Sequence, residues 1–129
     1  MRTVTVEAVL RLHGRIIERT GGRGGLRDPG ALEAAVMRAT SGASGVLLYP
    51  TVFLAAAAVA HGITTAHPFI DGNKRTALIT AYAVMRINGM EIDSAEDEEE
   101  RAILDLTNRD ISLNDFAEWL ERHSFPLSE

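Results

Sequence analysis

The sequence contains no cysteine, which excludes disulfide bonds, thiolate catalysis and cysteine-based zinc sites. It also lacks an excess of basic residues, since 13 Lys and Arg stand against 18 Asp and Glu and the net charge is -5. A surface that binds nucleic acid must neutralise phosphates with a basic face. We therefore expect no nucleic-acid partner, and any macromolecular partner is expected to be a protein.

The chain also lacks a long uninterrupted apolar segment. The longest apolar stretch, residues 46–60, is interrupted by Pro50 and Thr51 and is too short to span a bilayer. The first seven residues contain no apolar secretory segment. These absences predict a cytoplasmic protein without a membrane partner. With 129 residues, 46% hydrophobic and 24% charged, the chain has ordinary globular composition, and we expect one domain over residues 1–129.

Apolar residues recur at helical spacing through most of the chain. The pattern predicts helices over residues 5–20, 29–40, 50–66 and 76–88, and two more that begin after capping-box patterns at Ser94 and Ser112. Asp28 and Pro29 suit the N-cap and first position of the second helix. No strand-period segment of useful length is present. We predict an all-α bundle of about six helices in one compact domain.

The two central helices are expected to form the core. Residues 52–60 are apolar on every side of a helix, which is typical of a buried element whose alanines permit close approach of neighbours. Residues 77–87 form an apolar partner that ends at Gly89. The turn between these helices is therefore held on rigid elements.

That turn, residues 67–75, gathers most of the reactive side chains of the sequence. Pro68 and Gly72 break the chain, so the following residues lie at the N-terminus of a helix, where free amides and the helix dipole attract anions. Lys74 and Arg75 add positive charge. Asp71 suits a divalent ion bound to nucleotide phosphates, and His67 suits a proton acceptor for an incoming hydroxyl.

The nine residues His-Pro-Phe-Ile-Asp-Gly-Asn-Lys-Arg resemble the signature of the Fic/Doc superfamily, and in particular its short Doc (death-on-curing) toxin branch. The segment 24–28, Gly-Gly-Leu-Arg-Asp, and Asn88-Gly89 are also similar to that branch. The resemblance implies a small all-helical protein that transfers part of a nucleotide, or its terminal phosphate, to a hydroxyl of a target protein.

The resemblance also implies a role for each residue of the turn. His67 would take the proton from the target hydroxyl, and Asp71 would bind a Mg²⁺ ion that bridges the phosphates. The nucleotide and phosphate contacts would come from Gly72, Asn73, Lys74 and Arg75. Phe69 is expected to anchor the loop.

Two positions distinguish the possible reactions. AMP-transferring relatives usually have glycine at the position of Lys74 and a second arginine at the position of Leu78. Both differences match the Doc branch, in which the terminal phosphate of ATP faces the histidine. We therefore expect a protein kinase that modifies Ser or Thr, by resemblance on elongation factor Tu, and arrests translation and growth. The alternatives are a Fic-type nucleotidyl (AMP) transferase acting on a protein hydroxyl and a non-catalytic protein-binding module.

The resemblance further implies two protein contacts. Doc proteins are typically encoded with a small antitoxin, so a Phd-like antitoxin is an expected partner. The self-inhibitory pattern of the family is not complete, because Ala8 interrupts it after Thr3 and Glu7, and this favours control by a separate chain. Val46, Leu47 and Leu48 correspond to a flap that holds the target segment in extended form. The alternative is a short connector whose leucines pack in the core.

Three further features have plainer interpretations. His13, on the apolar side of the first helix, is expected to be a partly buried histidine satisfied by a hydrogen bond. The glycines at positions 21–25 match no phosphate-loop pattern and are expected to form a connector that borders the pocket. A hydrolytic metal site made by His61, His67 and Asp71 is a weaker alternative, because the spacing fits no two-histidine helix motif.

Overall fold

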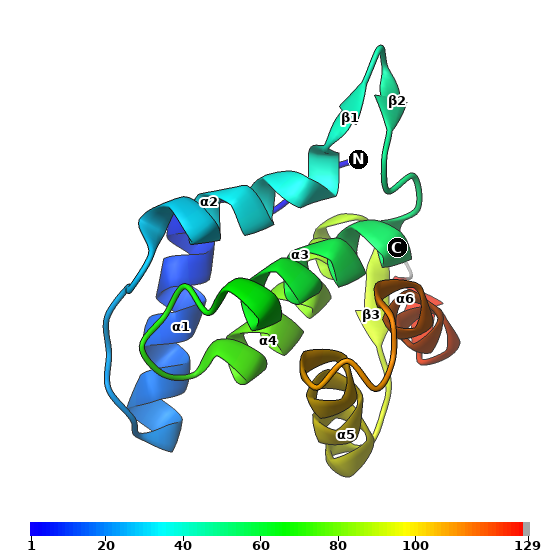
Figure 1. The fold of residues 1–129 in the computed structure, drawn as a ribbon. Helices are drawn as coiled ribbons and strands as arrows, with labels where there is room; N and C mark the ends of the chain where they lie inside the picture. Colours follow the sequence, from blue (N-terminus) through cyan, green and yellow to red (C-terminus); the bar gives the residue numbers. More distant parts are fainter. Residues whose placement is uncertain (128–129) are drawn as a thin grey trace.

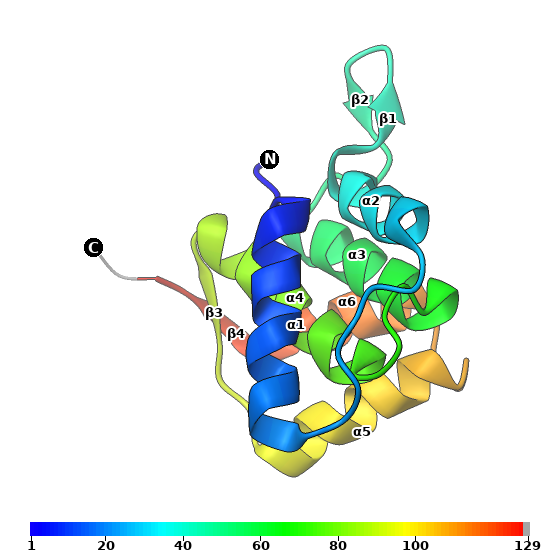
Figure 2. The same ribbon diagram turned by 90° about the vertical axis from the view of Figure 1, so that its left-hand side faces the viewer.

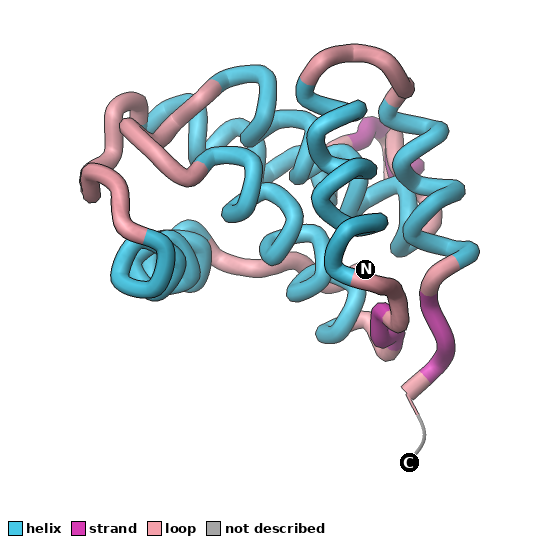
Figure 3. Tube along the Cα trace, turned by 90° about the horizontal axis from the view of Figure 1, so that it is seen from below, coloured by secondary structure: helices cyan, strands magenta, loops and turns pink. Residues whose placement is uncertain are grey.

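The computed structural model describes residues 1–127 and contains six α-helices with one short 3₁₀ helix. Helices dominate the chain trace, as Figure 3 shows, and the predicted all-α fold is confirmed. The helices are α1 (Val6–Thr20), α2 (Pro29–Met37), η1 (Arg38–Thr40), α3 (Val52–Ala66), α4 (Asn73–Ile87), α5 (Glu96–Thr107) and α6 (Leu113–Arg122).

In the described part of the chain, four short strands form two antiparallel pairs that the sequence pattern does not predict. Strands β1 (Gly42–Ala43) and β2 (Val46–Leu47) form a hairpin, with Gly42 opposite Leu47. Strand β3 (Met90–Ile92) pairs with β4 (Ser124–Pro126). Figure 2 shows the hairpin projecting from the helical body. Elements of two or three residues are too short to produce a period-2 signal.

Helix α3 lies in the middle of the molecule, with α2 along one side and α4, α5 and α6 around the others (Figure 1). Residues 55–60 of α3 have no exposed surface, which confirms the prediction of a buried central helix. The small side chains let neighbouring helices approach closely. At Gly62, a Cβ atom would lie only 2.9 Å from Cβ of Ala35 in α2. The core therefore fixes the position at which α3 ends and α4 begins.

Side chains cap the starts of most helices. The N-cap residues whose side chains accept a backbone N–H three residues later are Thr5, Asp28, Thr51 and Ser112. The capping box predicted at Ser112 is confirmed. The one predicted at Ser94 is wrong, because Ala95 is the N-cap of α5 and the Ser94 hydroxyl donates instead to Glu99 Oε1 at 2.9 Å. Helix ends therefore depend on tertiary partners as well as local sequence.

Two of the central boundaries differ from the prediction. Helix α3 begins at Val52 because Thr51 is its N-cap, and Pro50 stays outside the helix. Helix α4 begins at Asn73, three residues before the predicted start. Lys74 and Arg75 therefore lie in the first turn of α4 itself. No helix within residues 1–127 has the length and apolar character that crossing a membrane requires.

Candidate active site at the turn between two central helices

His67 ends helix α3 with a backbone conformation that non-glycine residues rarely adopt. Its φ of 50° and ψ of 60° lie in the left-handed region, and its N–H donates to the Ile63 carbonyl oxygen at 3.1 Å. The residue is exposed. Non-glycine residues adopt this region at an energetic cost, which often accompanies a functional position. The backbone thus directs the chain out of α3 at the residue predicted to act as the base.

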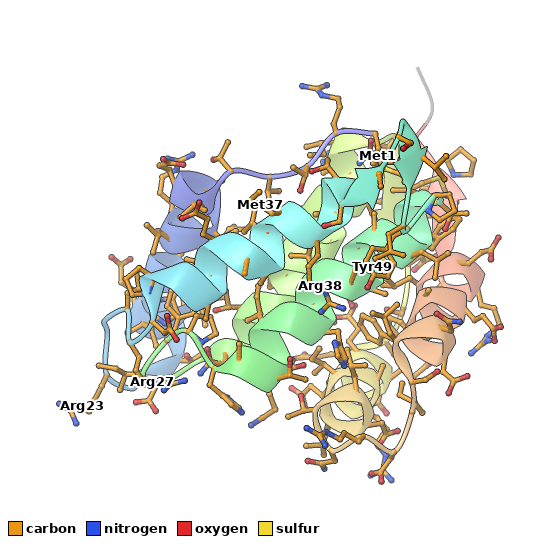
Figure 4. The ribbon with its side chains drawn as sticks, turned by 45° about the horizontal axis from the view of Figure 1, so that its top comes forward. Met1, Arg23, Arg27, Met37, Arg38 and Tyr49 are labelled. Atoms are coloured by element: carbon orange, nitrogen blue, oxygen red, sulfur yellow. The ribbon has the colours of Figure 1, made fainter. Side chains whose placement is uncertain are left out.

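Arg27 stabilises this backbone conformation. Its Nε donates to the His67 carbonyl oxygen at 2.9 Å, and one of its terminal nitrogens donates to the Ala66 carbonyl oxygen at 2.8 Å. A cation at a helix C-terminus also interacts favourably with the helix dipole. Figure 4 shows Arg27 beside the turn between α3 and α4, on the segment that leads into α2. Arg27 therefore fixes both the end of α3 and the carbonyl of the predicted base.

The side chain of Asn73 closes the turn from inside. Its Oδ1 accepts the Phe69 N–H at 3.0 Å, and its Nδ2 donates to the Phe69 carbonyl oxygen at 2.9 Å. Phe69 is 1% exposed, so the ring anchors the loop in the core as predicted. Asn73 keeps one side-chain hydrogen and its backbone N–H for another partner. Its predicted phosphate contact would have to use these.

The glycine-rich segment before α2 runs along the turn. Pro68 O accepts the N–H groups of Arg27 and Asp28 at 2.6 and 3.0 Å, and the Ile70 N–H donates to Gly25 O at 3.2 Å. Leu26 and Phe69 form an isolated antiparallel bridge. The segment thus borders the site, as expected, and its backbone holds the turn in place.

Asp71 is bound from two sides. Its Oδ2 accepts the backbone N–H of Arg23 at 2.7 Å, and its carbonyl oxygen lies 2.8 Å from His13 Nε2. Asp71 is exposed, and Oδ1 makes no hydrogen bond within residues 1–127. One carboxylate oxygen is therefore fixed and the other is open to a ligand.

Helix α4 begins with an open N-terminus. Gly72 is its N-cap with φ 81° and ψ 17°, and no side chain caps the helix. The first helical hydrogen bond of α4 runs from the Thr76 N–H to Gly72 O at 3.0 Å, so the N–H groups of Asn73, Lys74 and Arg75 have no acceptor within the helix and are available to an anion. Lys74 has no ion-pair partner within the described residues, whereas Arg75 lies 3.5 Å from Glu100 of α5.

A cleft of about 490 Å³ opens beside this helix start. Its wall comes from the end of α1, the first half of α4 and residues 96–104 of α5, and it combines apolar side chains with Lys74 and Arg75. Three glutamates also line it, at positions 96, 99 and 100. Glu99 accepts from Ser94 and Glu100 pairs with Arg75, so two of the three carboxylates are already engaged. Acidic side chains of α5 thus face the cleft.

Six predicted site residues lie in one segment of the structure, and four of them, residues 72–75, line the cleft; three others lie apart. His67, Asp71, Gly72, Asn73, Lys74 and Arg75 share the turn and the start of α4. The predicted flap residues Val46, Leu47 and Leu48 belong to the hairpin at the opposite end of α3, as Figure 1 shows. The 15 residues of α3 span about 22 Å between them. Val46 and Leu48 are 70% and 65% exposed, so they do not pack in the core.

His61 is also separate from the turn. Arg38 donates to His61 Nδ1 at 3.0 Å and to the Tyr49 hydroxyl at 3.0 Å; Figure 4 labels both Arg38 and Tyr49. Burial, Arg38 and Arg109 lower the pKa of His61 below its ordinary value. Residues 1–127 contain no group of three histidine or acidic side chains placed to hold a metal ion. The hydrolytic site of His61, His67 and Asp71 is therefore wrong.

Comparison with known proteins identifies the family. The model of the Fic/DOC family matches residues 3–85. The chain belongs to the Fic/Doc family. It is 36% identical to Toxin Doc of Mycolicibacterium smegmatis over 99 residues, which cover 75% of this chain and 76% of that protein. It is 33% identical to Protein kinase doc of Escherichia phage P1 over 127 residues, 95% of each chain. These relatives support the Doc branch of the family.

Sequence reasoning missed two residues of this Doc-branch site. In the sequence, Arg27 is only part of a segment similar to the Doc branch, because nothing in helical periodicity assigns a role to a loop arginine. The sequence predicts His13 to be a partly buried histidine with a hydrogen bond, and it is 5% exposed and hydrogen-bonded as expected. Its partner, the carbonyl of Asp71, could not be identified because a pairing across 58 positions leaves no local signal.

Proposed function

We propose that this protein is a Doc-like toxin that transfers the γ-phosphate of ATP to a Ser or Thr hydroxyl of a target protein in the cytoplasm. The names of the two relatives, Toxin Doc and Protein kinase doc, support this proposal. By resemblance the target is elongation factor Tu, and the result is arrest of translation and growth.

The observation that carries the proposal is the pairing of an exposed histidine with an uncapped helix start in one hydrogen-bonded turn. His67 lies at the end of α3, and Gly72 opens α4 five residues later. Phosphoryl transfer depends mainly on alignment and charge stabilisation, and this turn supplies groups for both. In the proposed reaction His67 takes the hydroxyl proton, the oxygen attacks the γ-phosphorus, and the bond to ADP breaks.

The phosphates would lie at the start of α4. The free N–H groups of its first turn would donate to phosphate oxygens, and Lys74 and Arg75 would neutralise charge that develops in the transition state. Mg²⁺, when bound, would supply further charge neutralisation. Asp71 fits such an ion because Mg²⁺ in nucleotide sites needs only one or two carboxylates besides phosphates and waters, and its Oδ1 is open.

Two side chains in the cleft favour one part of the nucleotide as the group transferred. Leu78 is 5% exposed and lines the cleft at the position where AMP-transferring relatives have a second arginine. Lys74 lines the same cleft at the position of their glycine. A triphosphate in the AMP-donating orientation would lose one cationic contact and meet the lysine side chain. These features favour transfer of the terminal phosphate.

Two protein contacts belong to the proposal. A Phd-like antitoxin would control the activity, which the name of the mycobacterial relative, Toxin Doc, supports. The hairpin residues Val46, Leu47 and Leu48 would hold the target by strand pairing. Because the hairpin and His67 lie at opposite ends of α3, an extended target segment would need about seven residues to span the roughly 22 Å between them.

The experiment that tests the proposal uses ATP labelled at either the α- or the γ-phosphate. We expect only the γ label to reach purified elongation factor Tu, and acid hydrolysis of the product to yield phosphoserine or phosphothreonine. Transfer of the α label instead would make the protein an AMP transferase and refute the kinase.

His67→Ala is the matched control. The side chain is exposed, so we expect the variant to melt near the wild-type temperature while label transfer and growth arrest are lost. Growth arrest that is equal in wild type and variant would instead support a non-catalytic binding module.

A further inference from the structure

A buried histidine of α1 contacts the backbone of the turn, and the proposed reaction gives it no part. His13 is 5% exposed, and its Nε2 lies 2.8 Å from the Asp71 carbonyl oxygen. Its ring stacks on Phe69 with a centroid distance of 3.8 Å and an angle of 8° between the planes. A carbonyl oxygen only accepts, so Nε2 carries the hydrogen of this bond.

This hydrogen bond orients the peptide between Asp71 and Gly72. That peptide is trans and planar, so its C=O and N–H point in opposite directions. Because the Asp71 carbonyl points to His13, the Gly72 N–H must point away from α1. It then extends the row of free N–H groups at the start of α4.

Glycine alone would not maintain this orientation. The angles of Gly72, φ 81° and ψ 17°, are those of the third residue of a type II turn. If the peptide between Asp71 and Gly72 flipped, so that its C=O and N–H exchanged directions, the turn would become type I and Gly72 would have a φ of about -90°. Glycine adopts either sign of φ with little difference in energy. In the reversed form a carbonyl oxygen, and not an N–H, would face the phosphate.

His13 provides the contact that selects between the two forms. Within residues 1–127, the Asp71 carbonyl oxygen has no other hydrogen-bond donor. The backbone of Gly72 packs closely beneath it, since a Cβ atom there would lie 3.6 Å from the His13 ring and 3.3 Å from Ile17 Cδ1. The stack on buried Phe69 fixes the plane of the imidazole.

We propose that His13 is a positioning residue that keeps the Gly72 N–H directed at the phosphate to be transferred. The inference rests on the function proposed above, because it assigns the N–H to a transferred phosphoryl group. His13 itself does not touch the substrate. Its contribution is the preorganised direction of a backbone donor, which in other acyl- and phosphoryl-transfer sites is a large part of transition-state stabilisation.

Two substitutions separate the hydrogen bond from the packing. His13→Phe keeps an aromatic ring over Phe69 and loses the donor. His13→Gln loses the ring and places an amide N–H at about the position of Nε2. If Phe does not fit, His13→Met also removes the donor with a more adaptable side chain. Thermal denaturation of each variant establishes that it is folded.

The first readout needs no ligand and no activity. In the wild type, the NOE between Asp71 Hα and the Gly72 amide proton is expected to be strong, as in a type II turn. It should weaken in His13→Phe and return in His13→Gln. An unchanged NOE in His13→Phe overturns the proposal. This readout is informative even if the wild type transfers no label, a result that would refute the proposed function alone.

The second readout is label transfer from ATP. We expect His13→Phe to lower kcat by about 10²-fold, the usual effect of losing one oxyanion donor, with KM for the target protein nearly unchanged. His13→Gln should stay within a few-fold of the wild type. A purely structural role predicts instead that both variants lose activity only in proportion to their unfolded fraction, and that outcome also overturns the proposal.

Discussion

Arg27 Nε donates to the carbonyl oxygen of His67 at 2.9 Å, across 40 positions of the chain. The same guanidinium reaches the carbonyl of Ala66, so a single side chain holds the last two peptide units of α3. His67 adopts a left-handed backbone conformation that non-glycine residues rarely adopt. The hydrogen bonds from Arg27 offset part of the energetic cost of this conformation. The direction in which the histidine leaves the helix thus depends on a residue that precedes α2.

Arg27→Lys tests this dependence. Lysine keeps the charge but not the planar guanidinium that reaches two carbonyls at once. We therefore expect the free energy of unfolding to fall by about 1 kcal/mol and the rate of label transfer to fall about tenfold or more. Chemical denaturation and transfer from labelled ATP measure the two effects. Arg23→Lys is the matched control, because Arg23 contacts Asp71 only through its backbone N–H. Equal loss in both variants would contradict the assigned role.

Gly62→Ala tests the packing of α2 on α3. Helix propensity alone predicts that this change raises the free energy of unfolding by about 1 kcal/mol. The new Cβ, however, would lie 2.9 Å from Cβ and 3.1 Å from Cα of Ala35, so α2 would have to move. Overpacking of this kind costs about 1–3 kcal/mol, and we expect net destabilisation.

Gly14→Ala provides the opposite result from the same chemical change. Gly14 lies in α1, and a Cβ there would meet no neighbouring atom within 4 Å. Helix propensity should therefore determine the effect, and the variant should be more stable by up to about 1 kcal/mol. Denaturant midpoints of the two variants that move in the same direction would show that the α2–α3 contact is looser than the structure indicates.

Much of the fold could be predicted from local sequence patterns, and the structure contains the predicted elements. The apolar residues 52–60 predicted a buried helix, and Asp28 and Ser112 predicted two helix starts, because a side-chain oxygen at an N-cap needs only a partner three residues away. Ser94 has the same local pattern, yet its hydroxyl donates to Glu99 instead. A competing partner nearby decides such cases, and local sequence does not reveal it.

The candidate site was predictable where its residues are contiguous and unpredictable where they are not. One segment supplies His67, Asp71 and Lys74, so a motif could identify all of them. Arg27 and His13 contact that segment from 40 and 58 positions away, and only the packing of the helices brings them there. The separation of the hairpin from His67 is likewise set by the length of α3, which a motif does not report.

His61 gives a pH-dependent prediction. Burial, Arg38 and Arg109 lower its pKa in the folded protein, so below the ordinary value of 6.5 the unfolded chain binds more protons than the folded one. Stability should therefore fall as the pH decreases from 6.5 toward the folded-state pKa. Asparagine can accept from Arg38 without titrating, so His61→Asn should show a weaker fall. If the denaturation midpoints of the wild type and of His61→Asn fall by the same amount between pH 8 and pH 5, His61 does not have this role.

Gly42→Ala tests the predicted flap. A Cβ at Gly42 would overlap the Val46 carbonyl oxygen, so the β1–β2 pairing should open. If the hairpin holds the target, KM for the target protein should rise severalfold, while affinity for ATP, whose proposed site lies at the other end of α3, stays unchanged. Ala43→Ser, an exposed change in the same strand, is the control. An unchanged KM in Gly42→Ala would remove Val46, Leu47 and Leu48 from the proposed target site.

Glu100→Gln tests whether Arg75 is shared between a carboxylate and the phosphates. The Arg75–Glu100 pair is 3.5 Å long, and its side chains are 46% and 59% exposed, so its removal should change stability by less than about 1 kcal/mol. Arg75 would then be free, and the cleft would lose one negative charge. We expect affinity for Mg–ATP to rise about 2- to 5-fold at low ionic strength, and the gain to shrink in high salt because exposed charges are screened.

The control for this variant removes a carboxylate of α5 that pairs away from the cleft. Asp105 lies 3.3 Å from Arg101 and does not line the cleft of Lys74 and Arg75. Asp105→Asn changes the net charge by the same amount, so any general electrostatic effect appears in both variants. Calorimetric titration with Mg–ATP at two ionic strengths separates the local effect from the general one. Equal affinities for the two variants would mean that Arg75 does not contact the phosphates, because releasing it would then have made no difference.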